Sequence, residues 1–450
     1  MPLTDDALRD AVRARLPEVR AALEDLVRIP SVSADPAAAG DVRASADRTA
    51  ELFRTAGAPD VRILAVDGGQ PAVVARWPAP EGAPTVLLYA HHDVQPVGDR
   101  TAWGTEPFQP VERDGRLYGR GAADDKAGVA AHLAAVRAYD GRPPVGVTVF
   151  VEGEEEIGSP TLAPFLAEYR DLLACDVIVL ADSVNWKIGV PALTVSLRGL
   201  AECYVEVRTL AGAVHSGMGG GLVPDALMTL SRLLATLHDD AGEVAVDGLV
   251  GAESDPLDLT EEQVRREVGA VDGLRLSGTG SLTSRMWTKP AISVLAVDAP
   301  RIADAVNVVV PVARAKVSMR VAPGDDAKRA QEALRRHLET HVPWGAEVTV
   351  TPGECAQPYA VTAEGPVYDA ARSAFAAAWQ HEPVDIGIGG SIPFIAAFNE
   401  AFPDAAILVT GVEDPEAGAH GTNESLHLAE FERACVAETL LLARLADQGR

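Results

Sequence analysis

The sequence has little that would suit a secreted or membrane-inserted chain. Its four cysteines are scattered without a Cys-x-x-Cys pair, so we expect reduced thiols rather than a disulfide framework. No apolar run approaches the ~20 residues that a membrane-spanning helix needs. Charged residues interrupt the first ten positions, which do not have the pattern of a signal peptide. These absences predict a cytoplasmic protein that contacts no membrane.

Positive charge is also scarce. Lysine and arginine together number 39 against 65 aspartates and glutamates, and the formal net charge at pH 7 is −26. This surplus of negative charge argues against nucleic acid and anionic membrane surfaces as partners. It is compatible with a protein that holds divalent cations. No Gly-Lys-Ser/Thr ending is present, so the glycine-rich loops do not predict a phosphate site.

The order of apolar patterns predicts two domains in the 450 residues. Apolar strands alternate with helices over residues 1–195, which is typical of an α/β sheet flanked by helices, with its ligand site at the strand ends. From residue 196 apolar and polar residues alternate, as in a half-exposed antiparallel sheet. The first pattern returns at residue 358. We therefore expect one domain from residues 1–195 and 358–450, with residues 196–357 as an inserted α+β domain.

The segment Thr148–Pro160 is the centre of the functional argument. It begins in an apolar strand and ends in three consecutive carboxylates, Glu154, Glu155 and Glu156. Carboxylates crowded at the end of an apolar strand either raise their pKa values or bind cations. For an isolated Glu triplet, a solvated acidic turn is the simpler interpretation. Here the strand delivers the acids to the edge of a core, where α/β proteins bind ligands.

A second apolar strand, Thr85–Ala90, continues into His91-His92-Asp93. Because side chains alternate along a strand, His91 and Asp93 are expected to share a face, and His92 to point away. A carboxylate two residues beyond a ligand histidine commonly orients the imidazole. Ordinary surface histidines remain the alternative interpretation of this motif alone.

Two aspartates follow related patterns. Asp182 comes directly after the apolar strand Val177–Leu180, where it could also be a simple turn residue. Asp124 precedes a helix that begins near Ala127, where a carboxylate could serve only as a helix cap. Each aspartate is ambiguous by itself, and only the recurrence of ligand types at strand ends favours a common site.

Together these residues have the composition of a two-metal hydrolytic site. Imidazole plus carboxylate ligation suits Zn²⁺, with Mn²⁺ or Co²⁺ as alternatives. Two cations ~3.5–4 Å apart need a shared carboxylate and about two further ligands each. A further carboxylate beside the metals can take a proton from the attacking water and return it to the leaving amine. The assembled set is His91, Asp93, Asp124, Glu155, Glu156, Asp182 and His420.

Five motifs follow one another in an order that resembles the M20 family of metallopeptidases, which includes dipeptidases, carnosinases and the acetylornithine and succinyl-diaminopimelate deacylases. Each motif is weak alone, but five in family order cover nearly the whole chain. They are H-x-D-V-Q-P from His91, G-R-G-x-x-D-D-K from Gly119, E-G-E-E-E-I-G-S from Glu152, H-S-G from His215 and A-H-x-x-N-E from Ala419.

The resemblance implies two divalent metal ions per subunit, most simply Zn²⁺. Asp124 would bridge both ions. His91 and Asp182 would complete one site, and Glu156 and His420 the other. The implied fold is a zinc-exopeptidase-like mixed sheet flanked by helices, with the inserted domain as a lid that also forms a homodimer.

The resemblance also implies roles in the reaction. Asp93 would orient His91, and Glu155 would be the general base. The peptide bond that follows the bridging aspartate is cis in the family, so we expect a cis bond between Asp124 and Asp125.

The inserted domain would supply the substrate contacts. By resemblance, His215 would stabilise the oxyanion, from the same subunit or across the dimer, with Asn307 nearby. Arg320 would bind a substrate carboxylate, and Gly390 and Ser391 would line the same end through backbone and hydroxyl donors. A loop histidine and an ordinary strand arginine are the alternatives for His215 and Arg320.

The motifs favour a metallo-dipeptidase that acts on dipeptides or short peptides. An N-acyl-amino-acid deacylase of the acetylornithine or succinyl-diaminopimelate type would use the same metals, and the shape of the pocket would distinguish the two. A metal-binding scaffold without catalysis would not need Asp93 or Glu155. A metal-free glycosidase with paired acids would leave His91 and His420 without roles.

Overall fold

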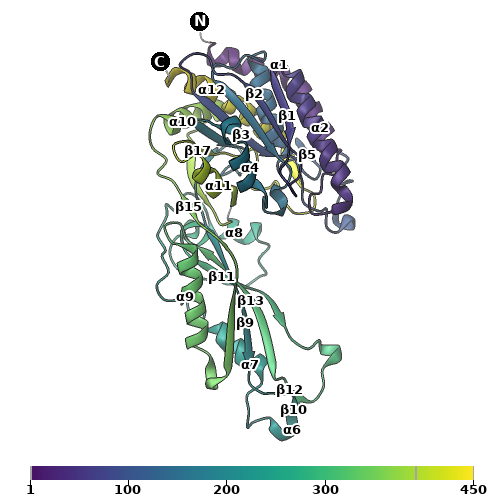
Figure 1. The fold of residues 1–450 in the computed structure, drawn as a ribbon. Helices are drawn as coiled ribbons and strands as arrows, with labels where there is room; N and C mark the ends of the chain where they lie inside the picture. The colour runs from purple at the N-terminus through teal and green to yellow at the C-terminus, as the bar shows by residue number, and fades with distance from the viewer. Residues whose placement is uncertain (1–2, 391–392, 449–450) are drawn as a thin grey trace. The chain divides into compact units, whose positions relative to one another are not determined.

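Short runs of valine, leucine and isoleucine build the largest sheet of the structure, a computed structural model that describes residues 3–390 and 393–448 (Figure 1). Its nine strands run in the order β1-β2-β6-β3-β7-β17-β8-β15, with β16 paired to β8. β3 is parallel to β6 and β7, and β17 is parallel to β7, whereas β1 and β2 pair antiparallel. The strands are β1 (Asp60–Leu64), β2 (Ala72–Trp77), β3 (Thr85–His91), β6 (Gly146–Glu152), β7 (Val177–Leu180), β8 (Ala192–Leu197), β15 (Tyr359–Ala360), β16 (Val384–Ile388) and β17 (Ala406–Val409).

Helices flank this sheet and bury apolar faces with helical spacing. In the first helix Leu8, Val12 and Val19 are fully buried, as their spacing predicts. α1, α3 and α12 pack against one another, α10 packs against α12, and α3 also contacts β3. The mixed sheet with flanking helices confirms the predicted α/β class. The helices are α1 (Asp5–Val27), α2 (Ala39–Thr55), α3 (Lys126–Ala138), α4 (Leu162–Glu168), α5 (Arg170–Leu173), α10 (Pro366–Trp379), α11 (Pro393–Ala401) and α12 (Leu428–Gln448).

A small three-stranded sheet joins two segments that lie far apart in the chain. It consists of β4 (Val111–Arg113), β5 (Arg116–Tyr118) and β18 (Ser425–His427), in the order β18-β5-β4. Ser425 lies opposite Tyr118 in this sheet. The loop before β18 therefore lies beside the glycine-rich turn that follows β5, although more than 300 residues separate them in the sequence.

The chain divides into two compact units. Unit 1 comprises Met1–Val195, Thr362–Ile386 and Phe394–Arg450, and unit 2 comprises Ser196–Val361 and Gly387–Pro393. The strands β8, β15 and β16 contain or adjoin the residues at which the chain passes between the units.

Unit 2 is built on a four-stranded antiparallel sheet in the order β11-β13-β9-β14. Alternate residues of β9, namely Cys203, Val205 and Val207, are buried in the core of the unit together with apolar residues of α7 and α9. The larger elements are β9 (Gly199–Arg208), β11 (Ala291–Asp298), β13 (Val312–Val321), β14 (Glu347–Ala356), α7 (Ala226–Ala235), α8 (Glu261–Glu267) and α9 (Ala327–Thr340). A short ladder with its adjoining helix consists of β10 (Val214–His215), β12 (Val308–Val309) and α6 (Ser216–Gly219).

Short helical turns complete the assignment. Within residues 3–390 and 393–448, five of these are 3-10 turns, and Ser284–Thr288 (η4) is a π-helical turn in unit 2. The 3-10 turns are η1 (Pro36–Ala38), η2 (Arg100–Ala102), η3 (Glu155–Ile157), η5 (Ile302–Asp304) and η6 (Pro343–Gly345).

The structure differs from the sequence pattern at two places. The sequence predicts one helix over residues 161–173, which the structure breaks at Tyr169, between α4 and α5. The sequence also predicts a glycine-rich turn over residues 386–393 that leads into a helix; the bend at Gly389 and Gly390 and helix α11 are present, but Ile386, Gly387 and Ile388 belong to strand β16. Gly387 packs so closely on Trp287 that an added Cβ would lie 2.5 Å from that side chain. The glycine is therefore explained by a close approach within a strand.

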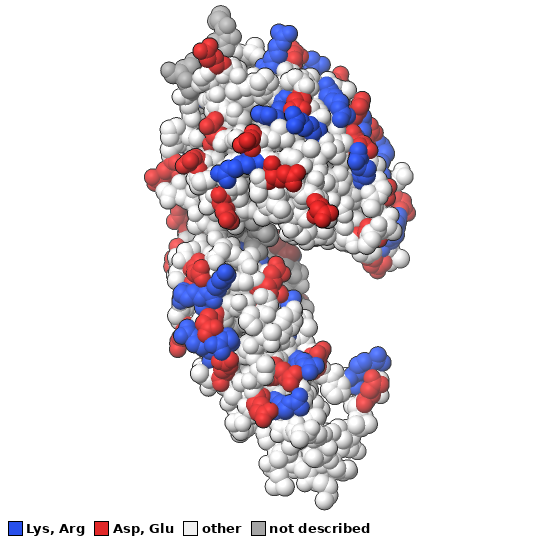
Figure 2. Space-filling view, in the orientation of Figure 1, with Lys and Arg blue, Asp and Glu red and all other residues white. Residues whose placement is uncertain are grey.

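The described part of the chain contains no helix that is both long and apolar enough to cross a membrane. On the face drawn in Figure 2, acidic and basic side chains are interspersed over both units. The acidic surplus of the sequence is thus not gathered in a single patch on that face.

Candidate metal centre

The register of three parallel strands gathers candidate ligands at one edge of the sheet. His91 at the end of β3 lies opposite Glu152 at the end of β6. β7, which leads into Asp182, pairs with β3 on its other side. Because parallel strands end at the same edge, residues following all three strands meet there.

His91 is fully buried and faces three acidic residues. Its Nε2 lies 3.1 Å from Asp124 Oδ1 and 3.9 Å from Glu155 Oε2. Its Nδ1 lies 3.1 Å from the carbonyl oxygen of Asp93 and 3.4 Å from Asp93 Oδ1. His92 points the other way, with its Nε2 2.8 Å from the carbonyl oxygen of Pro71. The alternation of the strand thus places His91 and Asp93 on one face.

Asp93 also fixes the turn that carries the glutamates. Its Oδ1 accepts a hydrogen bond from the backbone N–H of Glu155 at 3.2 Å, and its Oδ2 accepts one from that of Glu156 at 3.1 Å. A single buried carboxylate therefore contacts the His91 imidazole and orients the backbone of two neighbouring glutamates.

The carboxylate of Asp124 lies between two histidines. Its Oδ1 faces His91, and its Oδ2 lies 3.0 Å from Nε2 of His420. The same His420 nitrogen is 3.2 Å from Glu156 Oε2. Gln95 donates its side-chain N–H to that oxygen at 2.7 Å and its backbone N–H to Oε1 at 3.0 Å. Asp124 thus has the position of a shared ligand, with an imidazole at each oxygen.

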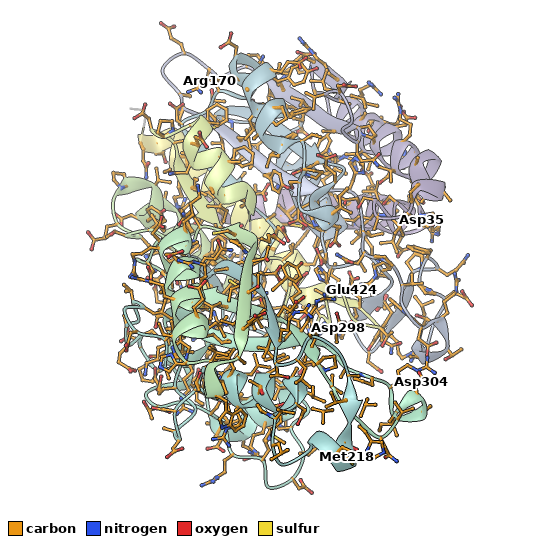
Figure 3. All side chains as sticks on the ribbon, turned by 60° about the horizontal axis from the view of Figure 1, so that its bottom comes forward. Asp35, Arg170, Met218, Asp298, Asp304 and Glu424 are labelled. Atoms are coloured by element: carbon orange, nitrogen blue, oxygen red, sulfur yellow. The ribbon has the colours of Figure 1, made fainter. Side chains whose placement is uncertain are left out.

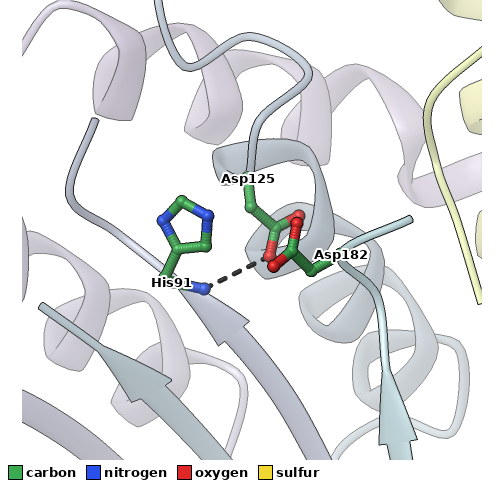
Figure 4. Close-up of side chains that lie close together, drawn as sticks. All are labelled: His91, Asp125 and Asp182. Atoms are coloured by element: carbon green, nitrogen blue, oxygen red, sulfur yellow. Dashed lines mark hydrogen bonds between the residues drawn. The ribbon is translucent and has the colours of Figure 1, made fainter. Parts of the chain in front are cut away.

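Two groups of ligand atoms are compact enough to hold a cation. The ligand atoms of His91, Asp124 and Glu156 lie within 4.8 Å of one another, and so do those of His91, Asp125 and Asp182. Figure 4 shows the carboxylates of Asp125 and Asp182 side by side next to His91. Asp125 was not among the ligands expected from the sequence.

Asp125 combines several contacts in one short turn. Its Oδ2 accepts the backbone N–H of His91 at 3.2 Å, and its Oδ1 accepts that of Gly128 at 3.2 Å. It is therefore the N-cap of α3, the role that the sequence left open for Asp124. The peptide bond between Asp124 and Asp125 is cis, as the family resemblance implied.

The charges of these groups fit a cation site. Burial raises the pKa of Asp182 to about 7. The positive charge of His91 lowers this pKa by less than burial raises it, and the negative charge of Asp124 raises it further. Burial and the Asp182 charge also raise the pKa of Glu155 and of Asp125 well above the ordinary range. So many carboxylates cannot ionise together unless positive charge lies among them. Divalent cations supply that charge, and the donor set of imidazole and carboxylate fits them.

The pKa values of the two histidines are also raised, which for an imidazole favours the charged form. Hydrogen bonds with Asp124 and Glu156 raise the pKa of His420 to about 11. Burial lowers the pKa of His91, but hydrogen bonds with Asp124 and Asp93 outweigh it and raise that pKa well above its usual value. Since a histidine must lose its proton to ligate a metal, cation binding here would displace protons.

Three acidic residues near the centre were missed or left without a role by the sequence reasoning. Glu154, the first of the triplet, accepts the backbone N–H of Gln70 and of Thr161, and so anchors the turn. Glu424, the last residue of the A-H-x-x-N-E motif, accepts the backbone N–H of Asp124 at 3.1 Å. Burial and the Asp124 charge raise the pKa of Glu413, whose backbone pairs with Val184 just beyond Asp182. Glu154 and Glu424 had a sequence signal, since each lies in one of the five motifs, whereas Glu413 had none.

The predicted substrate residues belong to unit 2. His215 is exposed at the end of β10, and its Nδ1 accepts the backbone N–H of Gly217 at 3.1 Å. Asn307 lies beside it, since its carbonyl oxygen accepts the backbone N–H of Ser216 at 2.9 Å. Met218, labelled in Figure 3, lies on the adjoining helix α6 and is 79% exposed.

The other predicted substrate residues are Arg320, Gly390 and Ser391. Arg320 is half-buried near the end of β13 and pairs in register with Ala291 of β11. Gly390 lies in the bend that follows β16. Ser391 lies outside the described residues.

Comparison with known proteins gives consistent matches. Residues 87–444 match the family described as peptidase family M20/M25/M40. A cysteinylglycine-S-conjugate dipeptidase of Corynebacterium striatum is 36% identical over 369 residues, which cover 80% of this chain and 81% of the relative. The human Beta-Ala-His dipeptidase is 28% identical, covering 82% of this chain and 76% of the relative.

Solved structures share the fold. Dug1p, a dipeptidase of Saccharomyces cerevisiae, has a TM-score of 0.81 at 22% identity, covering 99% of both chains. Human carnosine dipeptidase 1 also has a TM-score of 0.81, at 24% identity, covering 99% of this chain and 100% of that chain.

Proposed function

Since the chain belongs to peptidase family M20/M25/M40, we propose that it is a metallo-dipeptidase that hydrolyses the amide bond of dipeptides or short peptides. The names of its relatives specify dipeptide substrates, cysteinylglycine S-conjugates in one case and Beta-Ala-His in another. The observation that carries the proposal is the carboxylate of Asp124 between His91 and His420, with Glu155 close by.

The proposed cofactor is a pair of divalent cations, Zn²⁺ first, with Mn²⁺ or Co²⁺ as alternatives. Asp124 would be shared by both. His91 and Asp182 would complete one site, and Glu156 and His420 the other. When bound, such ions polarise the scissile carbonyl and make a water molecule acidic enough to attack it near neutral pH.

Glu155 is the proposed general base. It takes a proton from the attacking water and passes it to the nitrogen of the departing amine, so that the peptide bond breaks and the proton balance is kept. Two observations support this role. Its carboxylate is close to His91 without a hydrogen bond to it, and its backbone is fixed by Asp93. Burial also raises its pKa, which suits a group that must hold the proton before releasing it.

Unit 2 is the proposed lid and unit 1 the proposed catalytic domain, with boundaries near residues 195 and 358. Within the lid, His215 and Asn307 would stabilise the oxyanion. Arg320 would bind the C-terminal carboxylate of the substrate, together with Gly390 and Ser391. The close pairing of the backbones around His215 and Asn307 supports a common role.

A homodimer through the lid is the proposed assembly. β11 is an edge strand of the lid sheet, and its last six residues are exposed. Among them Val294, Leu295 and Val297 are 43%, 56% and 45% exposed. An open apolar edge strand favours pairing with another strand, and a second copy supplies an identical one.

The compartment proposed for the enzyme is the cytoplasm. All four cysteines are free thiols in the structure. Cysteines that remain unpaired suit a reducing compartment.

Mixed dimers will show which subunit supplies His215. His215→Ala and Glu155→Gln should each be nearly inactive, the first by about 10²–10³-fold as for a lost oxyanion donor. If His215 acts across the dimer, subunit exchange creates dimers with one intact site, and activity should recover to about one quarter of wild type. The two variants measured before exchange are the control. Activity that stays at the mean of the single variants would place His215 at the site of its own subunit.

A matched substrate panel tests the proposed reaction. The protein loaded with Zn²⁺ or Mn²⁺ is assayed for amine release from free dipeptides, including cysteinylglycine S-conjugates and Beta-Ala-His, and from N-acetyl and N-succinyl amino acids. We expect cleavage of the free dipeptides only. Cleavage of the acylated amino acids alone would replace the proposal by the deacylase, with the same metals and base. No cleavage with two metals bound would favour a non-catalytic metal-binding scaffold.

A further inference from the structure

Glu424 is a fully buried residue that the proposed reaction does not use. Its Oε1 accepts the backbone N–H of Ala123 at 2.9 Å and of Asp124 at 3.1 Å. Its Oε2 accepts the backbone N–H of Gly121 at 3.0 Å and an N–H of Arg120 at 2.7 Å. A single side chain therefore accepts three of the backbone N–H groups in the turn that ends in Asp124.

Arg120 connects this turn to a second loop. One guanidinium nitrogen donates to Glu424, and the other donates to the carbonyl oxygens of Gly421 at 2.9 Å and of His420 at 3.3 Å. A further bond at 3.3 Å reaches the carbonyl oxygen of Pro96, shortly after His91. Arg120 is 1% exposed and Glu424 0% exposed, so water does not compete for these contacts.

The two loops held by this pair carry the atoms that face each other across the centre. Asp124 comes from the turn that Glu424 satisfies, and His420 from the loop that Arg120 holds. Their side chains approach to 3.0 Å. Because desolvation offsets the attraction in a buried ion pair, the net stability that this pair contributes is small. What distinguishes it is its position between the two loops that carry Asp124 and His420.

We propose that Glu424, together with Arg120, is a positioning residue of the metal centre, which fixes the distance between the Asp124 carboxylate and the His420 imidazole. This inference rests on the proposed function in so far as those two residues bind metal. A residue that orients ligands in this way commonly changes metal affinity or activity by about 10–100-fold when it is replaced.

The same loop offers a matched control. Arg116 donates to both carboxylate oxygens of Asp414, at 3.0 and 2.8 Å, and both residues are buried. This second pair anchors the segment between β17 and β18 as Arg120 and Glu424 do, but no hydrogen bond joins it to the Asp124 turn in the described residues. Asp414→Asn therefore breaks a comparable ion pair without touching the ligands.

The test compares Glu424→Gln with Asp414→Asn. Both oxygens of Glu424 accept N–H groups, but a glutamine would replace one oxygen by an N–H₂ group that faces those donors. The turn around Asp124 must then move to avoid two opposed donors. We expect Glu424→Gln to bind metal about 10–100-fold more weakly in chelator competition, to lower kcat more than it raises KM, and to recover activity in excess Zn²⁺. Asp414→Asn should lose thermal stability to a similar degree but keep its metal affinity within about threefold.

Arg120→Lys is the second variant, used if Glu424→Gln does not fold. Lysine keeps the charge beside Glu424 but cannot donate to that carboxylate and to the His420 and Gly421 carbonyls through separate nitrogens. A smaller loss of metal affinity is expected.

The inference would be overturned if Glu424→Gln and Asp414→Asn lost the same amount of melting temperature and bound metal with the same affinity. A wild-type protein that binds two metals but cleaves no dipeptide would overturn the proposed function and leave this comparison valid. A wild-type protein that binds no divalent cation would overturn both.

Discussion

Replacing Glu155 by glutamine is expected to lower kcat by about 10³–10⁴-fold while both metal ions stay bound. The glutamine keeps the volume of the side chain and the backbone bond to Asp93, but it cannot accept the proton of the attacking water. The ligand atoms around Asp124 are not touched by the change. Metal content by elemental analysis and kcat on the preferred dipeptide are the two measurements.

Glu154→Gln is the matched control for this result, because it changes the neighbouring member of the same triplet. Both oxygens of Glu154 already accept hydrogen bonds, from Gln70 and Thr161. We expect this variant to lose about 1–3 kcal/mol of stability but to keep kcat within about tenfold. Near-normal turnover of Glu155→Gln would remove Glu155 as the base.

Asp124→Asn should abolish the two-metal centre. The carboxylate faces His91 with one oxygen and His420 with the other, whereas an asparagine offers one oxygen and one N–H₂ group. At least one of the two ions should be lost, and kcat/KM should fall by at least about 10³-fold. Metal stoichiometry after dialysis, read together with kcat/KM, checks this outcome.

Asp125→Asn decides which of the two adjacent aspartates is shared. The structure groups Asp125 with His91 and Asp182, but its oxygens also accept the backbone N–H groups of His91 and Gly128. An asparagine can keep one of these bonds, so we expect both ions to stay bound with weakened affinity at one site. Loss of both ions from Asp125→Asn, with retention in Asp124→Asn, would reverse the assignment.

The elements that could be predicted from the sequence are those with local signals. The apolar strand before His91 fixes which side chains share a face, and the crowded glutamates at the end of β6 indicate a polar edge of the sheet. The five motifs supplied the family and the set of candidate ligands. Strand ends and motifs are properties of short segments, so they can be recognised in a single sequence.

The contacts that could not be predicted join loops that are distant in the chain. Glu424 and Arg120 stand more than 300 positions apart, and no periodic pattern records that their loops meet. Asp124 and Asp125 are adjacent, and residue propensities locate a helix end only to within one or two residues. The sequence therefore could not show that Asp125 is the cap of α3. β16 was missed because glycines predict a turn unless the neighbouring Trp287 is known.

The place of β17 in the sheet has a consequence for synthesis on the ribosome. β17 lies between β7 and β8 and is parallel to β7, yet it leaves the ribosome more than 200 residues after β7. At about 5–20 residues per second, the edge of β7 stays unpaired on the nascent chain for roughly 10–45 s. Residues 196–361, which hold the whole β11-β13-β9-β14 sheet, emerge during that interval and can fold first. Until β17 pairs with it, the apolar strand β7 has unpaired backbone N–H and C=O groups along one edge. Such an edge can pair with the wrong strand or bind a chaperone.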